Sequence, residues 1–338
     1  MEIFWSMKKG YLPSNFTIQI LYYYGVMQWI IINLGKVLQK AMATTACESI
    51  NTAGSIFIGM TEAPLLIKPY IGLLTKSELH AVMTGGLATI AGTVMAAYIS
   101  FGVSPAHLIT ASVMSAPAAL CYSKLFYPET EKTKTKSKDV TVIKGEETNV
   151  LDAAATGATN ATSLILGIIA NMIAFVSFVA FLNGVLSWFG SLVGASELSF
   201  EWILAKVFIP LAWLLGVAPE ECENVAILMG LKTMVNEFVA YQKLSAFVKA
   251  GKISKRAETI ATYALCGFAN PGSVGILIGG LTAMAPEKRP VITELALRSF
   301  IAGSATCFLT ACVAGTLIDD GFMEGIQSDI TSNYTILP

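Results

Sequence analysis

The sequence predicts an all-α fold: a polytopic membrane protein with inverted repeats, re-entrant helical hairpins and discontinuous transmembrane helices. Three observations lead to this prediction. The chain of 338 residues is 54% hydrophobic and only 13% charged, and its mean hydropathy is +0.63. Several apolar runs reach about 20 residues, the length that a helix needs to cross a bilayer. Two further apolar segments are interrupted by glycine, proline and acidic residues, a pattern that does not fit a simple span.

The composition also excludes several classes of protein. Soluble domains carry about 25% charged residues, so this chain lacks the polar surface to cover itself in water. The net charge of −1 provides no basic field for a nucleic-acid partner. The six cysteines contain no CxxC pair, and two histidines are too few for a zinc site or a catalytic triad. We therefore expect neither an enzyme nor a protein with a bound cofactor.

Six apolar runs are long enough to be full membrane spans. They lie near residues 17–36, 78–101, 106–126, 164–190, 257–284 and 291–318. Residues 197–217 contain Pro210 and a tryptophan near each end, a pattern typical of an interfacial helix, with a seventh span as the alternative.

The two interrupted apolar segments are predicted to be re-entrant hairpins. Residues 44–68 contain Glu48, Asn51, Glu62 and Pro64, and residues 218–249 contain several acids and lysines. Non-helical backbone at membrane depth is stable only where protein or a water-filled cavity covers it. A hairpin that enters and leaves from one side, with its tip inside the protein, meets this condition.

The basic residues predict the orientation of the chain. Lysines follow the first span and the first hairpin, crowd the charged segment 124–150, and occur with Arg289 between the last two spans. Such loops face the cytosol by the positive-inside tendency, and counting crossings then places both chain ends outside. The basic residues between Lys243 and Arg256 fall on the opposite side and oppose this assignment.

The two halves of the chain repeat one order of elements: span, hairpin, span, span. Residues 86–94 (GLATIAGTV) and 267–274 (GFANPGSV) also match locally. Three spans per half make the halves insert in opposite orientations, which is the sequence pattern of a secondary transporter with its site at mid-membrane. Asn270-Pro271-Gly272 lies near the middle of a span, where proline removes a backbone donor. An unwound, ligand-binding segment is expected there, with a plain kink as the alternative.

Many ordered motifs together resemble the concentrative nucleoside transporter family. They are LYYYGVMQWII (21–31), GMTEAPLLIKPY (59–70), LTKSELHAVMTGG (74–86), TIAGTVMAAYISFGV (89–103), HLITASVMSAPAAL (107–120), NEFVAY (236–241) and ATYALCGFANPGSVGILIGGLTAMAP (261–286). The resemblance implies sodium-coupled symport of nucleosides by an elevator-type mechanism, with protons as the alternative coupling ion. It also implies a multi-pass protein of the plasma membrane that contacts the lipid bilayer and forms a homotrimer.

The resemblance also assigns site residues. Those implied to bind the nucleoside are Gly59, Met60, Thr61 and Glu62 at the base, Glu237, Asn270 and Ser273 at the ribose, and Phe268 beside it. Those implied to bind sodium are Ser55, Ile58, Thr89 and Ile90, the isoleucines through their carbonyls. The structural alternatives are, for Glu62, a salt bridge to Lys68 or an interfacial charge, for Glu237, a salt bridge to Lys232 or Lys243, and for Asn270 and Ser273, a purely structural role in the kink.

Four features depart from the family pattern. The chain resembles an N-terminally shortened form, because family members carry further spans before the one near Thr17. Relatives usually have glutamine at Met60, asparagine at Ser55 and a larger apolar residue at Pro271. Methionine cannot exchange hydrogen bonds with a base edge, whereas a serine hydroxyl can still ligate sodium. A truncated, non-transporting subunit that assembles with full-length relatives is therefore the alternative function.

These expectations divide the chain into six segments. They are an N-terminal segment and scaffold span (1–43), the first-repeat hairpin and transport-domain spans (44–126), a charged cytosolic linker (127–160), a scaffold span and interfacial helix (161–217), the second-repeat hairpin and transport-domain spans (218–318), and an acidic extracellular tail (319–338).

Overall fold

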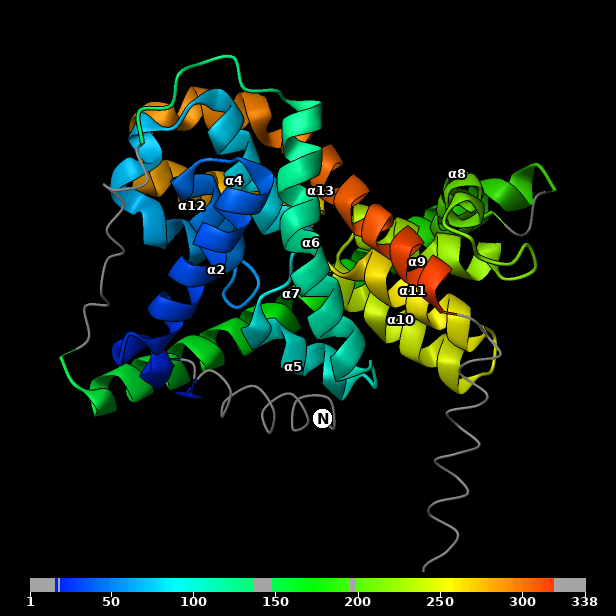
Figure 1. The fold of residues 1–338 in the computed structure, drawn as a ribbon. Helices are drawn as coiled ribbons and strands as arrows, with labels where there is room; N and C mark the ends of the chain where they lie inside the picture. Colours follow the sequence, from blue (N-terminus) through cyan, green and yellow to red (C-terminus); the bar gives the residue numbers. More distant parts are fainter. Residues whose placement is uncertain (1–15, 18, 136–147, 195–197, 319–338) are drawn as a thin grey trace, which may run out of the picture.

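A computed structural model describes residues 16, 17, 19–135, 148–194 and 198–318, and its ordered elements in these ranges are helices (Figure 1). The all-α prediction is confirmed. The first residues of the chain, most of the charged linker, the acidic tail and the predicted side of the two chain ends lie outside the described residues.

The helices follow one another in two similar series. The first series comprises α2 (Val26–Met42), α3 (Ala46–Gly54), the 3-10 segment η1 (Ala63–Leu73), α4 (Lys76–Ala88), α5 (Gly92–Ser100) and α6 (Pro105–Phe126). The long helix α7 (Val150–Leu192) comes next. The second series comprises α8 (Phe200–Leu214), α9 (Cys222–Met234), α10 (Glu237–Lys249), α11 (Lys255–Leu265), α12 (Pro271–Met284), the short η2 (Pro286–Lys288) and α13 (Arg289–Leu317).

The predicted span 17–36 is wrong as a single helix. Gly25 has a φ of +78°, a left-handed conformation that interrupts the helix, and α2 starts anew at Val26. Helix α2 packs on α3. A Cβ added at Gly35 would lie 3.0 Å from the Cα of Ile50, so the two helices approach closely there. In the second series α8, the predicted interfacial helix, packs on α9 in the same way. The counterpart of α8 is therefore α2.

Both predicted hairpins form as two arms joined by a non-helical tip. In the first, α3 packs against η1, and residues 55–62 connect them. In the second, α9 packs against α10, and Val235 and Asn236 connect them. Asn236 caps α10 by accepting a hydrogen bond from the Val239 amide at 2.9 Å, so the chain restarts its helix immediately after the tip.

Two predicted spans are discontinuous helices. The span 78–101 consists of α4 and α5, with a break at residues 89–91, and the span 257–284 consists of α11 and α12, with a break at residues 266–270. Pro271 is the first residue of α12, where its missing N–H leaves no internal hydrogen bond unmade. Asn270 caps that helix by accepting from the Ser273 amide at 2.9 Å. The unwound segment, rather than a plain kink, is the correct interpretation.

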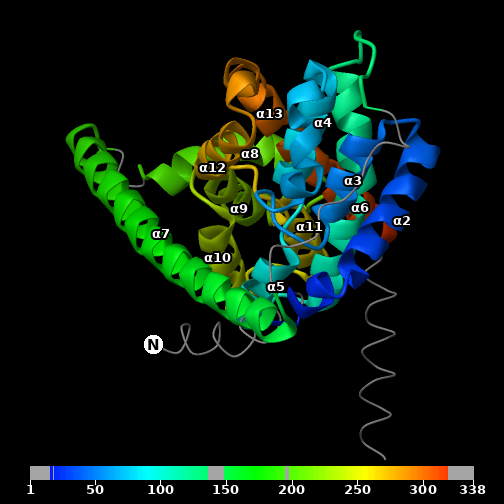
Figure 2. The same ribbon diagram turned by 90° about the vertical axis from the view of Figure 1, so that its left-hand side faces the viewer.

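Three of the described helices are long and apolar enough to cross a membrane without interruption: α6, residues 173–192 of α7, and the helix that ends at Leu317. Helix α7 begins at Val150 instead of near residue 164, because the Asn149 side chain caps it at the Asp152 amide and alanines follow. Figure 2 shows α7 as a long diagonal at the edge of the molecule, where it contacts α8 and α10 only sparsely.

The centre of the molecule is built from both series. Helix α13 packs against α4, α6 and α11, and α6 packs against α4. The second halves of the broken helices cross over: α12 contacts η1 and α4 of the first series, while Tyr98 of α5 lies against Phe238 of α10 with ring centroids 5.1 Å apart. Both breaks are therefore placed between the two series.

Candidate functional site

The helices α3 and α4 run in the same direction and end at the same level. Asn51 Nδ2 donates to the Val82 carbonyl at 3.3 Å, and further along the Gly92 amide donates to the Phe57 carbonyl at 3.1 Å. A Cβ added at Gly92 would lie 2.8 Å from that carbonyl oxygen, so glycine permits this approach. The last carbonyls of a helix lack internal partners and carry partial negative charge. Two such ends beside each other favour a cation.

The predicted sodium ligands lie in the two breaks that follow these helix ends. Ser55 Oγ donates to the Asn51 carbonyl at 3.0 Å, and Thr89 Oγ1 donates to the Gly85 carbonyl at 2.8 Å. Each hydroxyl proton is thus directed back at its own helix, which leaves the oxygen lone pairs for a cation. The Gly92–Phe57 hydrogen bond holds together the segments that carry Ile58 and Ile90.

The side chains there suit a hard cation. Ser55 and Thr89 are buried, and no group of three or more His, Cys, Asp or Glu side chains capable of holding a metal occurs among the described residues. Hydroxyl and carbonyl oxygens, without thiolate or imidazole, are ligands for ions such as sodium rather than for transition metals.

In the second repeat the candidate side chains lie at two helix N-termini. Glu237 is the first residue of α10 and Asn270 caps α12. Asn270 Nδ2 donates to Glu237 Oε2 at 2.7 Å, and the Tyr98 hydroxyl donates to Glu237 Oε1 at 3.4 Å. The positive end of a helix dipole favours a carboxylate at this place. The structure therefore brings Glu237 and Asn270 together and fixes the carboxylate from two sides.

The salt bridges weighed as alternatives for Glu237 do not form in the described part of the chain. Lys243 pairs with Glu201 at 2.8 Å, and the Lys232 ammonium has no hydrogen-bond partner. Asn270 has both of the roles considered for it, because its Oδ1 caps α12 while its Nδ2 holds Glu237. Asn270 can therefore have a structural role while the Glu237 carboxylate keeps acceptor positions for a ligand.

At the tip of the first hairpin, the Glu62 side chain turns back over Gly59. A Cβ added at Gly59 would collide with the Glu62 carboxylate, which would then have to move aside. The carboxylate thus lies against the backbone of its own loop. Glu62 is exposed, and no ion pair between it and Lys68 occurs among the described residues. This carboxylate is therefore held by its own loop rather than by a lysine.

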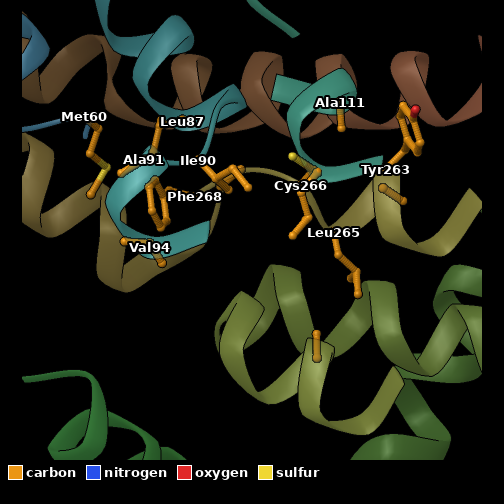
Figure 3. Close-up of a cluster of buried hydrophobic side chains, with 14 of the residues drawn as sticks. Met60, Leu87, Ile90, Ala91, Val94, Ala111, Tyr263, Leu265, Cys266 and Phe268 are labelled. Carbon is orange, nitrogen blue, oxygen red and sulfur yellow. The ribbon is translucent and has the colours of Figure 1, made fainter. Parts of the chain in front are cut away.

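An apolar wall connects the two halves of the site. Met60 and Phe268 are each 8% exposed and belong to one cluster with Leu87, Ala91 and Val94 (Figure 3). The tip of the first hairpin also reaches α12, since a Cβ added at Gly280 would lie 3.7 Å from Thr61 Cγ2. Met60 and Thr61 thus lie at the junction between the first hairpin and the second broken helix.

Two further residues, Tyr98 and Lys232, were not assigned to the site from the sequence. Tyr98 lies 139 positions away from Glu237 along the chain, and nothing in a single sequence connects a tyrosine inside an apolar run to a distant acid. Lys232 is fully buried in the same hairpin. A lysine within an apolar segment was the available signal, but it indicated only a salt bridge.

The comparisons with known proteins agree with this geometry. The family described as "Na+ dependent nucleoside transporter C-terminus" matches residues 107–315, more than half of the chain. The chain belongs to the sodium-dependent nucleoside transporter family. A second family, described as "Nucleoside recognition", matches residues 11–105. The predicted resemblance is confirmed, and the family is one of transporters rather than enzymes.

Two curated relatives of the family and one solved structure illustrate the similarity. Solute carrier family 28 member 3 of Rattus norvegicus is 50% identical over 317 residues, which cover 90% of this chain and 45% of the relative. Sodium/nucleoside cotransporter 2 of Rattus norvegicus is 47% identical over 334 residues, 94% of this chain and 51% of the relative. The chain thus spans about half the length of these proteins. CNTnw in an inward-facing substrate-bound state matches with a TM-score of 0.85 and 41% identity, over 90% of this chain and 73% of that one.

Proposed function

We propose that this chain binds a nucleoside together with sodium and carries both across the plasma membrane as a symporter. The observation that carries this proposal is the buried Glu237 carboxylate, fixed by Asn270 and Tyr98 at the junction of two helix N-termini. The relatives named as sodium/nucleoside cotransporters support it.

The ribose would bind at Glu237. A carboxylate has two oxygens with about four acceptor positions, and its two present donors leave positions for the 2′ and 3′ hydroxyls of a ribose. Hydrogen bonds to an ionised acceptor are about twice as strong as neutral ones. Ser273 lies on the first turn of α12, beside Asn270, and Phe268 provides an apolar surface for the sugar.

The base would lie against the first hairpin tip. Thr61 and Glu62 supply polar groups there, whereas Met60 contributes a thioether to the apolar wall. Base and ion then share one short segment, because residues 55–58 hold the sodium and residues 59–62 hold the base. Fixing this non-helical segment with one ligand lowers the ordering cost for the other. Sodium and nucleoside should therefore increase each other's affinity by the same factor.

Replacing Met60 with glutamine is expected to tighten nucleoside binding by roughly five- to ten-fold, a gain of about 1–1.4 kcal/mol, because an amide can satisfy a base edge that methionine leaves unpaired. In the absence of nucleoside the amide would lie in the apolar cluster, so the thermal midpoint should fall. Competition binding with several nucleosides, together with melting curves, measures both effects. If the affinity for every base is unchanged, Met60 does not face the base.

Replacing Thr89 with alanine is expected to raise the sodium concentration for half-maximal nucleoside binding about ten-fold, as loss of one ligand in a site of few ligands should do. Thr110→Ala is the matched control: its hydroxyl also donates to a carbonyl four residues earlier, at 2.7 Å, but on an exposed face of α6. Sodium titrations at fixed nucleoside decide it. Equal shifts in both variants would remove Thr89 from the ion site.

Transport would follow an elevator-type alternation in which residues 44–126 and 218–318 move as one unit against a scaffold that includes α7. The tight packing of α13 on α4, α6 and α11, and the sparse contacts of α7, support this division. Helix α8, which the sequence groups with the scaffold, packs closely on α9, so we propose that it moves with this unit. Assembly would be a homotrimer, as we expect for the family.

Uptake of radiolabelled nucleoside in transporter-null cells tests the proposed function. We expect uptake in sodium medium and its loss when choline replaces sodium, with proton coupling indicated instead if uptake follows an imposed pH gradient. Surface-expressed protein that binds nucleoside but never accumulates it would favour the alternative, a non-transporting subunit that assembles with longer relatives.

A further inference from the structure

Lys232 is a lysine in the interior of the second hairpin. It lies in the last turn of α9 and is fully buried. Its ammonium has no hydrogen-bond partner in the described part of the chain, and it lies over the Phe308 ring of α13, 5.7 Å from the centroid. An ammonium in such a place is costly, and stable proteins compensate it with a nearby charge of opposite sign.

The available negative charge is that of Glu237, five residues further along the same hairpin. Glu237 is buried as well, and only Val235 and Asn236 separate the end of α9, whose last turn carries Lys232, from Glu237 at the start of α10. The two charges are not in direct contact, since Lys232 takes part in no ion pair among the described residues. Two opposite charges buried in one hairpin, even without direct contact, would each offset the cost of burying the other.

The first repeat provides a comparison. There the ends of α3 and α4 leave carbonyls and hydroxyl lone pairs directed at a place for a mobile cation. In the second repeat the corresponding helices are α9 and α11. Lys232 lies in the last turn of α9, and its ammonium lies over Phe308 of α13, next to Cys307, whose thiol donates to the carbonyl of Cys266 at the end of α11. A side-chain cation is thus present in the second repeat where the first would take its cation from solution.

We propose that Lys232 is the built-in counter-cation of Glu237: a positioning residue that keeps the carboxylate ionised, and so able to accept both ribose hydroxyls, without a second bound ion. This inference rests on the proposed nucleoside site. It assigns Lys232 to ribose recognition although the side chain touches no substrate.

A double-mutant cycle tests the pairing independently of transport. Wild-type protein, Lys232→Met, Glu237→Gln and the double variant are purified in detergent, and their thermal midpoints are measured without ligand. Methionine replaces the ammonium with an apolar group of similar length. We expect Lys232→Met to lower the midpoint in the wild-type background, where it leaves Glu237 uncompensated. In the Glu237→Gln background we expect the same change to raise the midpoint, because it removes an uncompensated ammonium.

Lys206→Met, which removes an exposed lysine on α8, is the control and should leave the midpoint unchanged in both backgrounds. If Lys232→Met lowers the midpoint equally in both backgrounds, the lysine has only a packing role and the proposal is wrong. Should the single variant fail to fold, the double variant still decides: the proposal requires that it fold at least as well as Glu237→Gln.

Nucleoside affinity provides the second readout. For ribonucleosides, Lys232→Met is expected to weaken binding about ten-fold, whereas 2′,3′-dideoxynucleosides, which lack the hydroxyls, should lose little. Equal loss for both classes would contradict a role at the ribose. If no nucleoside binds even wild-type protein, the proposed function fails, while a reversal of sign in the melting cycle would still establish the pair.

Discussion

Glu237→Gln is expected to weaken nucleoside affinity at least ten-fold. The variant keeps the shape of the side chain and an acceptor oxygen for Asn270, which now lies 2.7 Å from the carboxylate. It removes the negative charge and turns one acceptor group into a donor, which then opposes either Tyr98 or a ribose hydroxyl. Losing a hydrogen bond to a charged group costs about 1.5–3 kcal/mol, and each 1.4 kcal/mol is a factor of about ten in affinity.

The matched control is Glu223→Gln, the same chemical change on α9 of the same hairpin. Glu223 is exposed and pairs with Lys206 at 3.2 Å. A surface ion pair of this kind contributes little to the free energy of unfolding. Equilibrium binding of a ribonucleoside to both purified variants, compared with a 2′,3′-dideoxynucleoside, makes the measurement specific for the sugar. An unchanged ribonucleoside affinity in Glu237→Gln at full folding would remove the ribose from this carboxylate.

Gly267→Ala is expected to have the largest effect on stability. Gly267 has a φ of +153° in the break between α11 and α12, a conformation that side chains rarely adopt. An added Cβ would lie 2.9 Å from the Leu87 carbonyl oxygen and still closer to Cys307 Sγ. Backbone strain and overpacking each cost about 1–3 kcal/mol, so we expect a loss of about 2–6 kcal/mol. The next residue is Phe268, so site geometry should be lost as well.

Gly275→Ala is the control for the general effect of adding a methyl group. Gly275 lies inside α12, and no atom approaches its Cβ position within 4 Å. Alanine there should be neutral or stabilise the protein by up to about 1 kcal/mol. Expression level and thermal midpoint in detergent compare the two variants. If Gly267→Ala and Gly275→Ala have the same thermal midpoint, the break around Gly267 is less tightly packed than these distances indicate.

Local sequence features predicted the breaks in this fold. Proline, glycine and an asparagine in the middle of an apolar run indicated the gap between α11 and α12, because proline cannot donate and asparagine is a good cap. The break after α4 was found only by its likeness to that segment. The break at Gly25 was not predicted, because a single glycine between tyrosines and a valine does not indicate that its φ is positive.

The site was predictable only in part. The resemblance to a family supplied the residues of both hairpin tips, and the structure shows why some of them are close: Asn270 caps one helix while it holds the acid that begins another. The contact of Tyr98 with Glu237 depends on the crossing of α5 into the second series, which no local pattern encodes. The environment of the Lys232 ammonium likewise depends on α13, a helix near the other end of the sequence, because Phe308 of α13 lies against it.

The most direct test of the account is equilibrium binding of a radiolabelled ribonucleoside to the purified protein, in sodium and in choline. In the proposed site, binding, unlike uptake, would require only the two hairpin tips and the two breaks, all of which lie among the described residues. We predict saturable binding in sodium that weakens at least ten-fold in choline, with Glu237→Gln abolishing most of it. Equal binding in both salts would contradict the link between the ion and the first hairpin, and no binding in either would contradict the nucleoside site itself.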